Sequence, residues 1–395
     1  MTNDSRLPAE NARDSGPGSA ADAAACRLGH RPWLDGVRGL ALLAVLFTHF
    51  HIITGGAIAM DVFFVLSGFL ITTMLAEEYQ RNGSISLKNF YMRRILRLFP
   101  AFAVLLLVFA IATILWTPPE HRADRWMEMV AAGCYIMNWH HYHGIQPSML
   151  GHTWSLSLEE QFYLLWPILL VTLLWFKVSK KRILWIIVTG IVLSCLWRAW
   201  LHNEHRVLGG ERIDRMRLYI GLDTRADALL MGCLIGLLFT WGMLPRSERI
   251  IAWLKPLSLA ALGVVAFCFF KRDHCSSQYY DGLYTVLAFA IAILFVRMLV
   301  APSPLCRAVL EWRPFLIAGK ISYGAYLFHI PLLAWLESPD MGWNDLNNVA
   351  LLFAASIAAG CASHYLVERP FLRLKDRFNA PTAAPPREAP LKLAA

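Results

Sequence analysis

Charged residues are scarce in this chain of 395 residues, because Asp, Glu, Lys and Arg together make up only 16% of it. Soluble domains usually carry about 25% charged residues. Hydrophobic residues make up 57%, and apolar runs long enough to cross a bilayer recur along the chain. The shortage of charge excludes a large soluble domain and indicates an all-α, polytopic bundle of membrane-spanning helices.

Apolar runs are missing at both ends of the chain. Residues 1–30 are polar and lack the short apolar core and small-residue cleavage site of a signal peptide. Residues 379–395 are rich in Pro and Ala, a composition typical of disordered segments. We therefore predict a cytoplasmic tail over 1–30, a transmembrane domain over 31–378 and a second cytoplasmic tail over 379–395.

The eight Cys residues show no spacing typical of metal ligands, so we predict no metal cofactor. Several of them lie inside apolar runs, where Cys usually behaves as a small core residue. Cys134 and Cys275 could both face an oxidising compartment, which leaves a disulfide between them as an open alternative.

Lys and Arg are absent from the connections on one predicted side of the membrane. We predict ten spans, over residues 34–54, 58–76, 98–117, 154–176, 183–201, 222–241, 256–270, 283–300, 315–336 and 346–366. The connections 55–57, 131–153 and 337–345 contain no Lys or Arg, whereas those on the opposite side are mostly short and basic. By the positive-inside rule both termini are cytoplasmic. The exception is the basic outer connection 202–222, whose orientation stays open.

The net charge of +9 follows this topology and does not indicate a nucleic-acid partner. We see no internal repeat.

The Ser67-Gly68 pair in the second span indicates close helix packing rather than a nucleophilic serine.

Two ionisable residues stand at opposite ends of the first predicted span. Arg38 and His49 are eleven residues apart, so they project from one stripe of the helix, about 16 Å apart along its axis. Ionisable groups at membrane depth normally face a bundle interior or a wet cavity. The first span is therefore predicted to line a passage that is basic at its inner end. The alternative, that Arg38 only anchors the span at the interface, stays open.

A second set of ionisable residues lies at the same two membrane depths as Arg38 (the inner level) and His49 (the outer level). At the inner level, Arg93, Arg94 and Arg97 suit a polyphosphate ligand, although topology anchoring explains them equally well. At the outer level Glu159 lies four residues after Ser155, about one turn into an apolar helix.

Three more ionisable residues share the outer level. Arg225 and Asp227 open the sixth span, and His329 lies in the outer half of the ninth. Together with Glu159, these groups form either a structural ion-pair network or a general base with its orienting partners.

Seven stretches, in order, resemble the membrane-bound acyltransferase-3 family of bacterial O-acyltransferases. They cover Trp33 to Arg373 and read LDGVRGLALLAVLFTHF, DVFFVLSGFLI, FYMRRILRLFP, HTWSLSLEEQFYLLWP, TRADALLMG, ISYGAYLFHIPL and VERPF. The resemblance implies a multi-pass enzyme of the bacterial plasma (inner) membrane. It would take an acyl group, most often acetyl, from cytoplasmic acyl-CoA and deliver it to a hydroxyl of a glycan or glycolipid outside.

The resemblance implies roles for five residues, namely Arg38, His49, Glu159, Arg94 and Arg97. The roles of the other residues below are expected from their positions in the sequence alone. We expect three catalytic residues, namely His49, Arg38 and Glu159. We expect a cluster that binds acyl-CoA, namely Arg94, Arg97 and Arg93. We expect a substrate-binding set on the outer side, namely Arg225, Asp227, His329, Trp154 and Ser155. Some relatives carry an appended extracytoplasmic hydrolase-like domain, which we expect this chain to lack.

His49 is expected to act as a general base, because His titrates near neutral pH and can pass the hydroxyl proton to the leaving thiolate. A covalent acyl-His intermediate stays open. The expected partners are acyl-CoA, the acceptor and the lipid bilayer. Acceptor identity, acyl length and oligomeric state are left open.

A proton-coupled glycolipid transporter or flippase would use the same ionisable residues. The absence of a repeat and of paired, broken spans in two halves counts against it. A non-catalytic scaffold does not explain Arg38 and His49 on one stripe. Dependence on acyl-CoA distinguishes the enzyme from the transporter.

Overall fold

The computed structural model describes residues 27–142, 149–207, 212–271, 275–336 and 346–378. The predicted tails are therefore outside the described residues, apart from 27–30. The longer helices are α2 (Pro32–His49), α3 (Ala59–Asn82), α4 (Leu87–Trp116), α7 (Trp154–Trp175), α8 (Lys180–Val207), α10 (Leu222–Thr240), α11 (Glu248–Phe270), α12 (Tyr284–Val300), α15 (Ser322–Leu336) and α16 (Leu346–Ala362). The shorter ones are α5 (Arg122–Gly133), α6 (Met137–Tyr142), α9 (Arg212–Ile220), α13 (Pro304–Leu310), α14 (Arg313–Lys320) and α17 (Arg369–Lys375).

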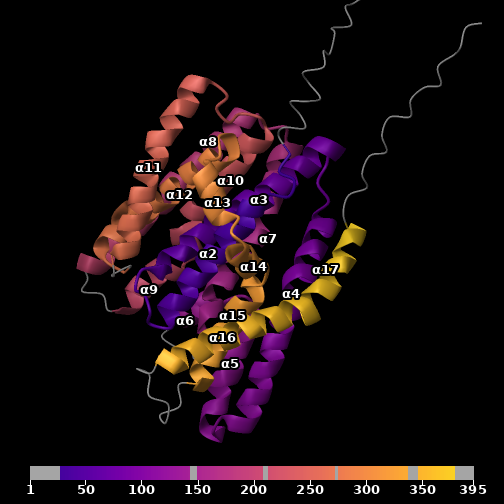
Figure 1. Ribbon diagram of the computed structural model, residues 1–395, viewed down its shortest axis with the longest axis vertical. Coiled ribbons are helices and arrows are strands. Elements are labelled where there is room, and N and C mark those ends of the chain that lie inside the picture. Colours follow the sequence, from indigo (N-terminus) through magenta and orange to yellow (C-terminus); the bar gives the residue numbers. More distant parts are fainter. Residues whose placement is uncertain (1–26, 143–148, 208–211, 272–274, 337–345, 379–395) are drawn as a thin grey trace, which may run out of the picture.

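Helices α2 and α3 lie in the middle of the bundle, with α11 and α12 on one side and α4 and α17 on the other (Figure 1). Helix α3 crosses α10 at two glycines. A Cβ at Gly68 would lie 2.0 Å from the Leu229 carbonyl oxygen, and one at Gly232 would lie 2.1 Å from that of Val65. The prediction of close packing at Gly68 is confirmed, because only small residues let two helix backbones approach this far.

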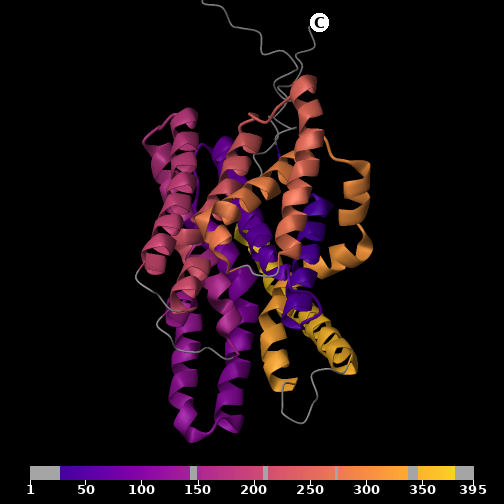
Figure 2. The ribbon, with the colours of Figure 1, turned by 90° about the vertical axis from the view of Figure 1, so that its left-hand side faces the viewer.

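The two ends of the described chain lie at the same end of the bundle. The Leu28 amide donates to Glu77 at 2.6 Å, and the neighbouring Glu78 pairs with Arg93 at 2.8 Å. Arg93 in turn donates to the Phe378 carbonyl oxygen at 2.7 Å. At the opposite end, α4 and α5 form a hairpin that extends beyond its neighbours (Figure 2).

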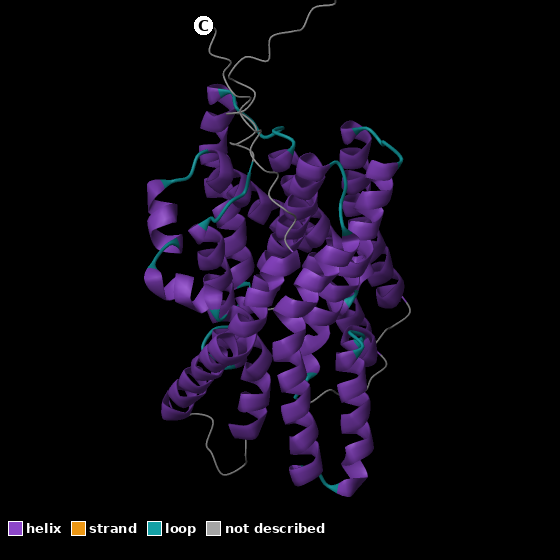
Figure 3. Ribbon diagram, turned by 90° about the vertical axis from the view of Figure 1, so that its right-hand side faces the viewer, coloured by secondary structure: helices purple, strands orange, loops and turns teal. Residues whose placement is uncertain are grey.

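In the described ranges every regular element is a helix (Figure 3). Seven of these helices are long and apolar enough to cross a membrane: Gly56–Asn82, Leu87–Trp116, Gly151–Trp175, Lys180–Glu204, Glu248–Phe270, Tyr279–Val300 and Asn348–Leu374. A bent pair of helices is an eighth candidate. The predicted membrane bundle is confirmed, while the count of ten spans and the cytoplasmic termini stay predictions.

The first and sixth predicted spans, 34–54 and 222–241, form α2 and α10, and neither is among those seven. Helix α10 carries Asp223, Arg225 and Asp227 within its first six residues. Both helices pack inside the bundle, where neighbouring helices rather than lipid surround their ionisable groups.

The ninth predicted span, 315–336, is not one continuous helix, which corrects the prediction. Helix α14 ends at Lys320, α15 begins at Ser322, and the two are bent by 73°. Gly319 lies so close to α2 that a Cβ there would be 1.9 Å from the Asp35 carbonyl oxygen. This contact holds α14 against α2 while α15 turns away.

The suggested disulfide between Cys134 and Cys275 is absent, because Cys134 is a free, exposed thiol.

Candidate active site

A cavity of about 500 Å³ runs along one face of α3, between α2, α4, α7 and α15. The residues of α3 that line it follow one another at the three- and four-residue spacing of a helix face: Met60, Phe63, Leu66, Ser67, Leu70, Ile71 and Met74. Met60 and Met74 are 14 residues apart, which is about 21 Å along the helix axis. The cavity therefore extends through much of the depth of a bilayer.

The mouth of the cavity lies near the beginning of the described chain, where Gly29 and His30 are exposed. The Arg, Asp and Glu side chains that line the cavity are four guanidinium groups and two carboxylates: Arg31, Arg38, Arg94, Arg97, Asp35 and Glu159. Arg38 pairs with Asp35 at 3.2 Å. The surplus of positive charge inside an apolar bundle favours an anionic ligand.

Glu159 projects from α7 into this cavity and is held by two hydroxyl groups. Ser67 Oγ donates to it at 2.8 Å and Tyr163 Oη at 3.1 Å. The guanidinium of Arg94 lies over the Tyr163 ring, 3.7 Å from its centroid. Ser67 is thus a partner of the carboxylate, and the carboxylate partly balances the cations of the cavity.

Three buried residues close the cavity at its far end and form what we call the Tyr326 wall: Met60, Ser155 and Tyr326. Their exposed fractions are 7%, 4% and 8%. The Tyr326 hydroxyl donates to the His152 carbonyl oxygen at 2.8 Å, shares a hydrogen bond with Ser155 Oγ and lies 3.9 Å from Met60 Sδ. The wall is therefore tied to α3, α7 and α15 at once.

Three imidazole rings pack behind the Tyr326 wall. The His329 ring centroid is 5.0 Å from that of His49 and 5.2 Å from that of His152. The Tyr326 ring lies 5.2 Å from His329 and 5.5 Å from His152. None of the three histidines lines the cavity. In the described part of the chain, no group of three His, Cys, Asp or Glu side chains is arranged to hold a metal ion.

A backbone hydrogen bond fixes the tautomer of His49. Its Nδ1 is 3.0 Å from the Val45 carbonyl oxygen. A carbonyl can only accept, so Nδ1 carries the proton and Nε2 keeps its lone pair. His49 is half-buried at the end of α2, so this nitrogen can serve as a general base for an approaching hydroxyl.

Residues 31–367 match the family model for the acyltransferase domain of the acyltransferase-3 family. The chain belongs to that family. Five of the seven stretches that carried the resemblance supply residues that line the cavity, and the other two, TRADALLMG and VERPF, do not.

The chain is also similar to O-acetyltransferases of other bacteria, and it spans about half of their length. It is 35% identical over 342 residues to peptidoglycan O-acetyltransferase OatA of Listeria monocytogenes, covering 82% of this chain and 53% of that protein. It is 32% identical over 318 residues to O-acetyltransferase OatA of Staphylococcus aureus, covering 78% and 51%. No solved structure matches the chain.

Five of the predicted binding residues do not line the cavity: Arg93, Trp154, Arg225, Asp227 and His329. Arg93 is buried against Glu78 and the Phe378 carbonyl, so its charge is already paired. Trp154 is half-buried and packs on the Tyr219 ring at 4.9 Å. Ser155 does line the cavity, as part of the Tyr326 wall.

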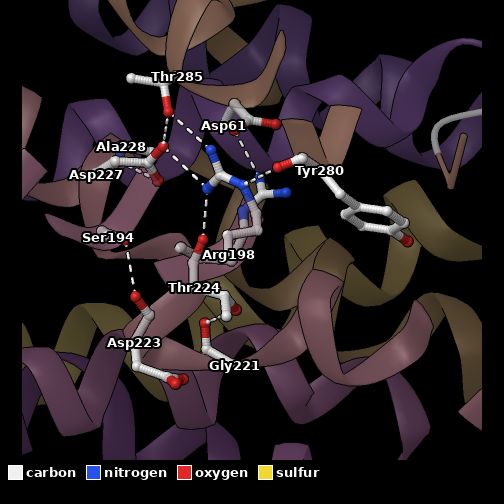
Figure 4. A network of polar contacts seen from close by, with 11 residues as sticks. Asp61, Ser194, Arg198, Gly221, Asp223, Thr224, Asp227, Ala228, Tyr280 and Thr285 are labelled. Atoms are coloured by element: carbon white, nitrogen blue, oxygen red, sulfur yellow. Dashed lines mark hydrogen bonds and ion pairs between the residues drawn. The ribbon is translucent and has the colours of Figure 1, made fainter. Parts of the chain in front are cut away.

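Arg225 and Asp227 each belong to a buried ion pair. Arg225 pairs with Asp61 at 2.6 Å and Asp227 with Arg198 at 3.0 Å, and all four are at most 1% exposed. In Figure 4, Arg198 reaches Asp227, Thr224 and Tyr280 from one position. These pairs join α3, α8 and α10 and lie outside the cavity.

Sequence reasoning missed four contributors to this architecture: Asp61, His152, Arg198 and Tyr326. A usable signal existed for the first three, because each is an ionisable residue within or beside an apolar run. Tyr326 carried no such signal, since a tyrosine in an apolar span is usually a packing residue.

Proposed function

We propose that this acyltransferase moves acetyl groups from cytoplasmic acetyl-CoA to hydroxyl groups of peptidoglycan or a related glycan on the outer side of the membrane. One observation carries the proposal: a long cavity, cationic near its mouth, ends at a wall behind which three histidines pack. The names of the relatives support acetyl as the group and peptidoglycan as the class of acceptor.

The cavity suits the two halves of an acyl-CoA. Arg38, Arg94 and Arg97 would bind its phosphates, because guanidinium groups make paired, charge-assisted hydrogen bonds to phosphate oxygens. The apolar stripe of α3 would contact the pantetheine arm. The acetyl end would then lie at the Tyr326 wall, the part of the cavity nearest to the histidines.

Transfer needs one proton-accepting group and a path to it. His49 Nε2 takes the proton of the acceptor hydroxyl while that oxygen bonds to the acetyl carbon. The carbon–sulfur bond breaks, the thiolate leaves with the electron pair, and His49 returns the proton to it. The Tyr326 wall has to open for this step, because Tyr326 lines the cavity on one side and contacts His152 and His329 on the other.

The test uses the full chain, purified and placed in nanodiscs with radiolabelled acetyl-CoA and soluble peptidoglycan fragments. We expect an alkali-labile acetyl ester on the glycan and release of one free CoA for each ester. A proton-coupled transporter would move glycolipid in proteoliposomes without acetyl-CoA. Transport without ester formation would therefore contradict the proposal.

Replacing Arg97 by Ala is expected to raise the KM for acetyl-CoA about 10-fold with little change in kcat. A hydrogen bond to a charged group contributes about 1.5–3 kcal/mol, and a phosphate contact remote from the thioester acts on ground state and transition state alike. The measurement is an acetyl-CoA titration of initial rates. Lys88→Ala is the matched control, since Lys88 is an exposed cation of the same helix outside the cavity. An unchanged KM in the Arg97 variant would leave topology anchoring as the role of this residue.

A further inference from the structure

We propose that Met60 sets the length of the acyl group that the enzyme transfers, by filling the end of the cavity in front of the histidines. The inference rests on the proposed function, because it takes acyl-CoA as the donor. It names a residue that determines whether the enzyme prefers acetyl-CoA to donors with longer acyl groups. Neither the family match nor the names of the relatives assign such a residue.

The orientation of acyl-CoA in the cavity follows from the two ends of the row of α3 residues that line it, Met60 and Met74. Met74 lies near the mouth, three residues before Glu77, which accepts the Leu28 amide. Met60 lies at the other end, 3.9 Å from the Tyr326 hydroxyl. Because the thioester carbon has to come close to His49, the acyl group points toward Met60 and the phosphates toward the mouth.

The Tyr326 wall limits how far the acyl group of the donor can extend toward the histidines. Met60, Ser155 and Tyr326 are each more than 90% buried, and together they end the cavity. Each additional methylene would either overlap the wall or push the thioester carbon back along α3, away from His49. A mismatch of one methylene in an apolar pocket changes specificity by about 10- to 200-fold.

Met60 is the member of the wall that can be shortened without loss of a strong hydrogen bond. Ser155 and Tyr326 are bonded to each other, and Tyr326 is also bonded to the His152 carbonyl. Because the Tyr326 hydroxyl donates its one proton to the His152 carbonyl, the Met60 thioether only contacts the hydroxyl oxygen, at 3.9 Å. Its flexible, unbranched side chain therefore acts mainly by the volume that it fills.

The experiment compares acetyl-CoA, propionyl-CoA and butyryl-CoA as donors for wild type and Met60→Ala in nanodiscs. We expect Met60→Ala to raise the ratio of kcat/KM for butyryl-CoA to that for acetyl-CoA by about 10-fold or more. Met74→Ala is the matched control, since it shortens the same side chain on the same helix and in the same cavity, 14 residues nearer the mouth. Its donor preference should equal that of wild type, whatever its absolute rate.

Several other results would contradict either the inference about Met60 or the proposed function. Equal donor ratios in wild type and Met60→Ala would overturn the inference, as would an equal shift in Met74→Ala, which would indicate general loosening of the bundle. A wild type that uses butyryl-CoA as well as acetyl-CoA would also overturn it. If Met60→Ala does not fold, Met60→Val must show a smaller shift in the same direction. Failure of wild type to use any acyl-CoA would instead contradict the proposed function itself.

Discussion

Replacing His49 by Ala is expected to lower acetyl transfer about 100-fold or more without lowering the amount of folded protein in the membrane. The hydrogen bond to Val45 leaves His49 Nε2 as the proton acceptor, and an Ala side chain supplies no substitute. The substitution removes a half-buried ring at the end of α2, so the cost in packing is small. The measurement is the initial rate of ester formation, with size-exclusion profiles of both proteins.

His51 offers a matched control two residues along the chain. It is exposed, and its backbone has a φ of +58°, a region that Asn tolerates better than most residues. His51→Asn should therefore keep wild-type turnover. A His49→Ala protein that inserts normally and turns over near the wild-type rate would refute the role of general base.

Replacing Arg225 by Met is expected to destabilise the folded protein by about 3–5 kcal/mol, because it leaves the Asp61 carboxylate buried without its partner. The loss should appear as a lower thermal midpoint in detergent and less protein in the membrane. A substrate-binding role would instead give normal stability and a higher KM for the glycan acceptor. A fall in stability thus indicates a structural role for Arg225, and a rise in KM indicates a substrate-binding role.

The double variant Asp61→Asn, Arg225→Met tests the cause of that loss. Neutralising the carboxylate removes the uncompensated charge, so we expect the double variant to recover a large part of the stability. An equal or larger loss in the double variant would show that the cost comes from the Arg225 contacts with Tyr284 and Tyr219 rather than from the ion pair.

Apolar runs were enough to predict the helical bundle, because the length of a spanning helix is set by the bilayer. The same pattern could not show the bend between Lys320 and Ser322, since both halves of that segment are apolar and the bend follows from contact with α2. It also missed α5, an amphipathic helix too polar to stand out as a span.

The site was predictable in part. Helical spacing placed Arg38 in a passage, and charge in an apolar run singled out Glu159; both line the cavity. Spacing could not separate Arg93 from Arg94, because the difference lies in Glu78, a partner from another helix. The assembly of His49, His152 and His329 likewise depends on α2, α15 and the turn before α7, and no single segment encodes how these three lie relative to one another.

The Tyr326 wall also bears on the energetics of the cell. A continuous wet path through the bundle would let protons run down the membrane potential, and each charge that crosses 100 mV dissipates about 2.3 kcal/mol. With Met60, Ser155 and Tyr326 in place, the basic cavity and the histidines are separate compartments. A wall that opens only while the donor fills the cavity would let the acetyl group reach the acceptor without opening a path for ions.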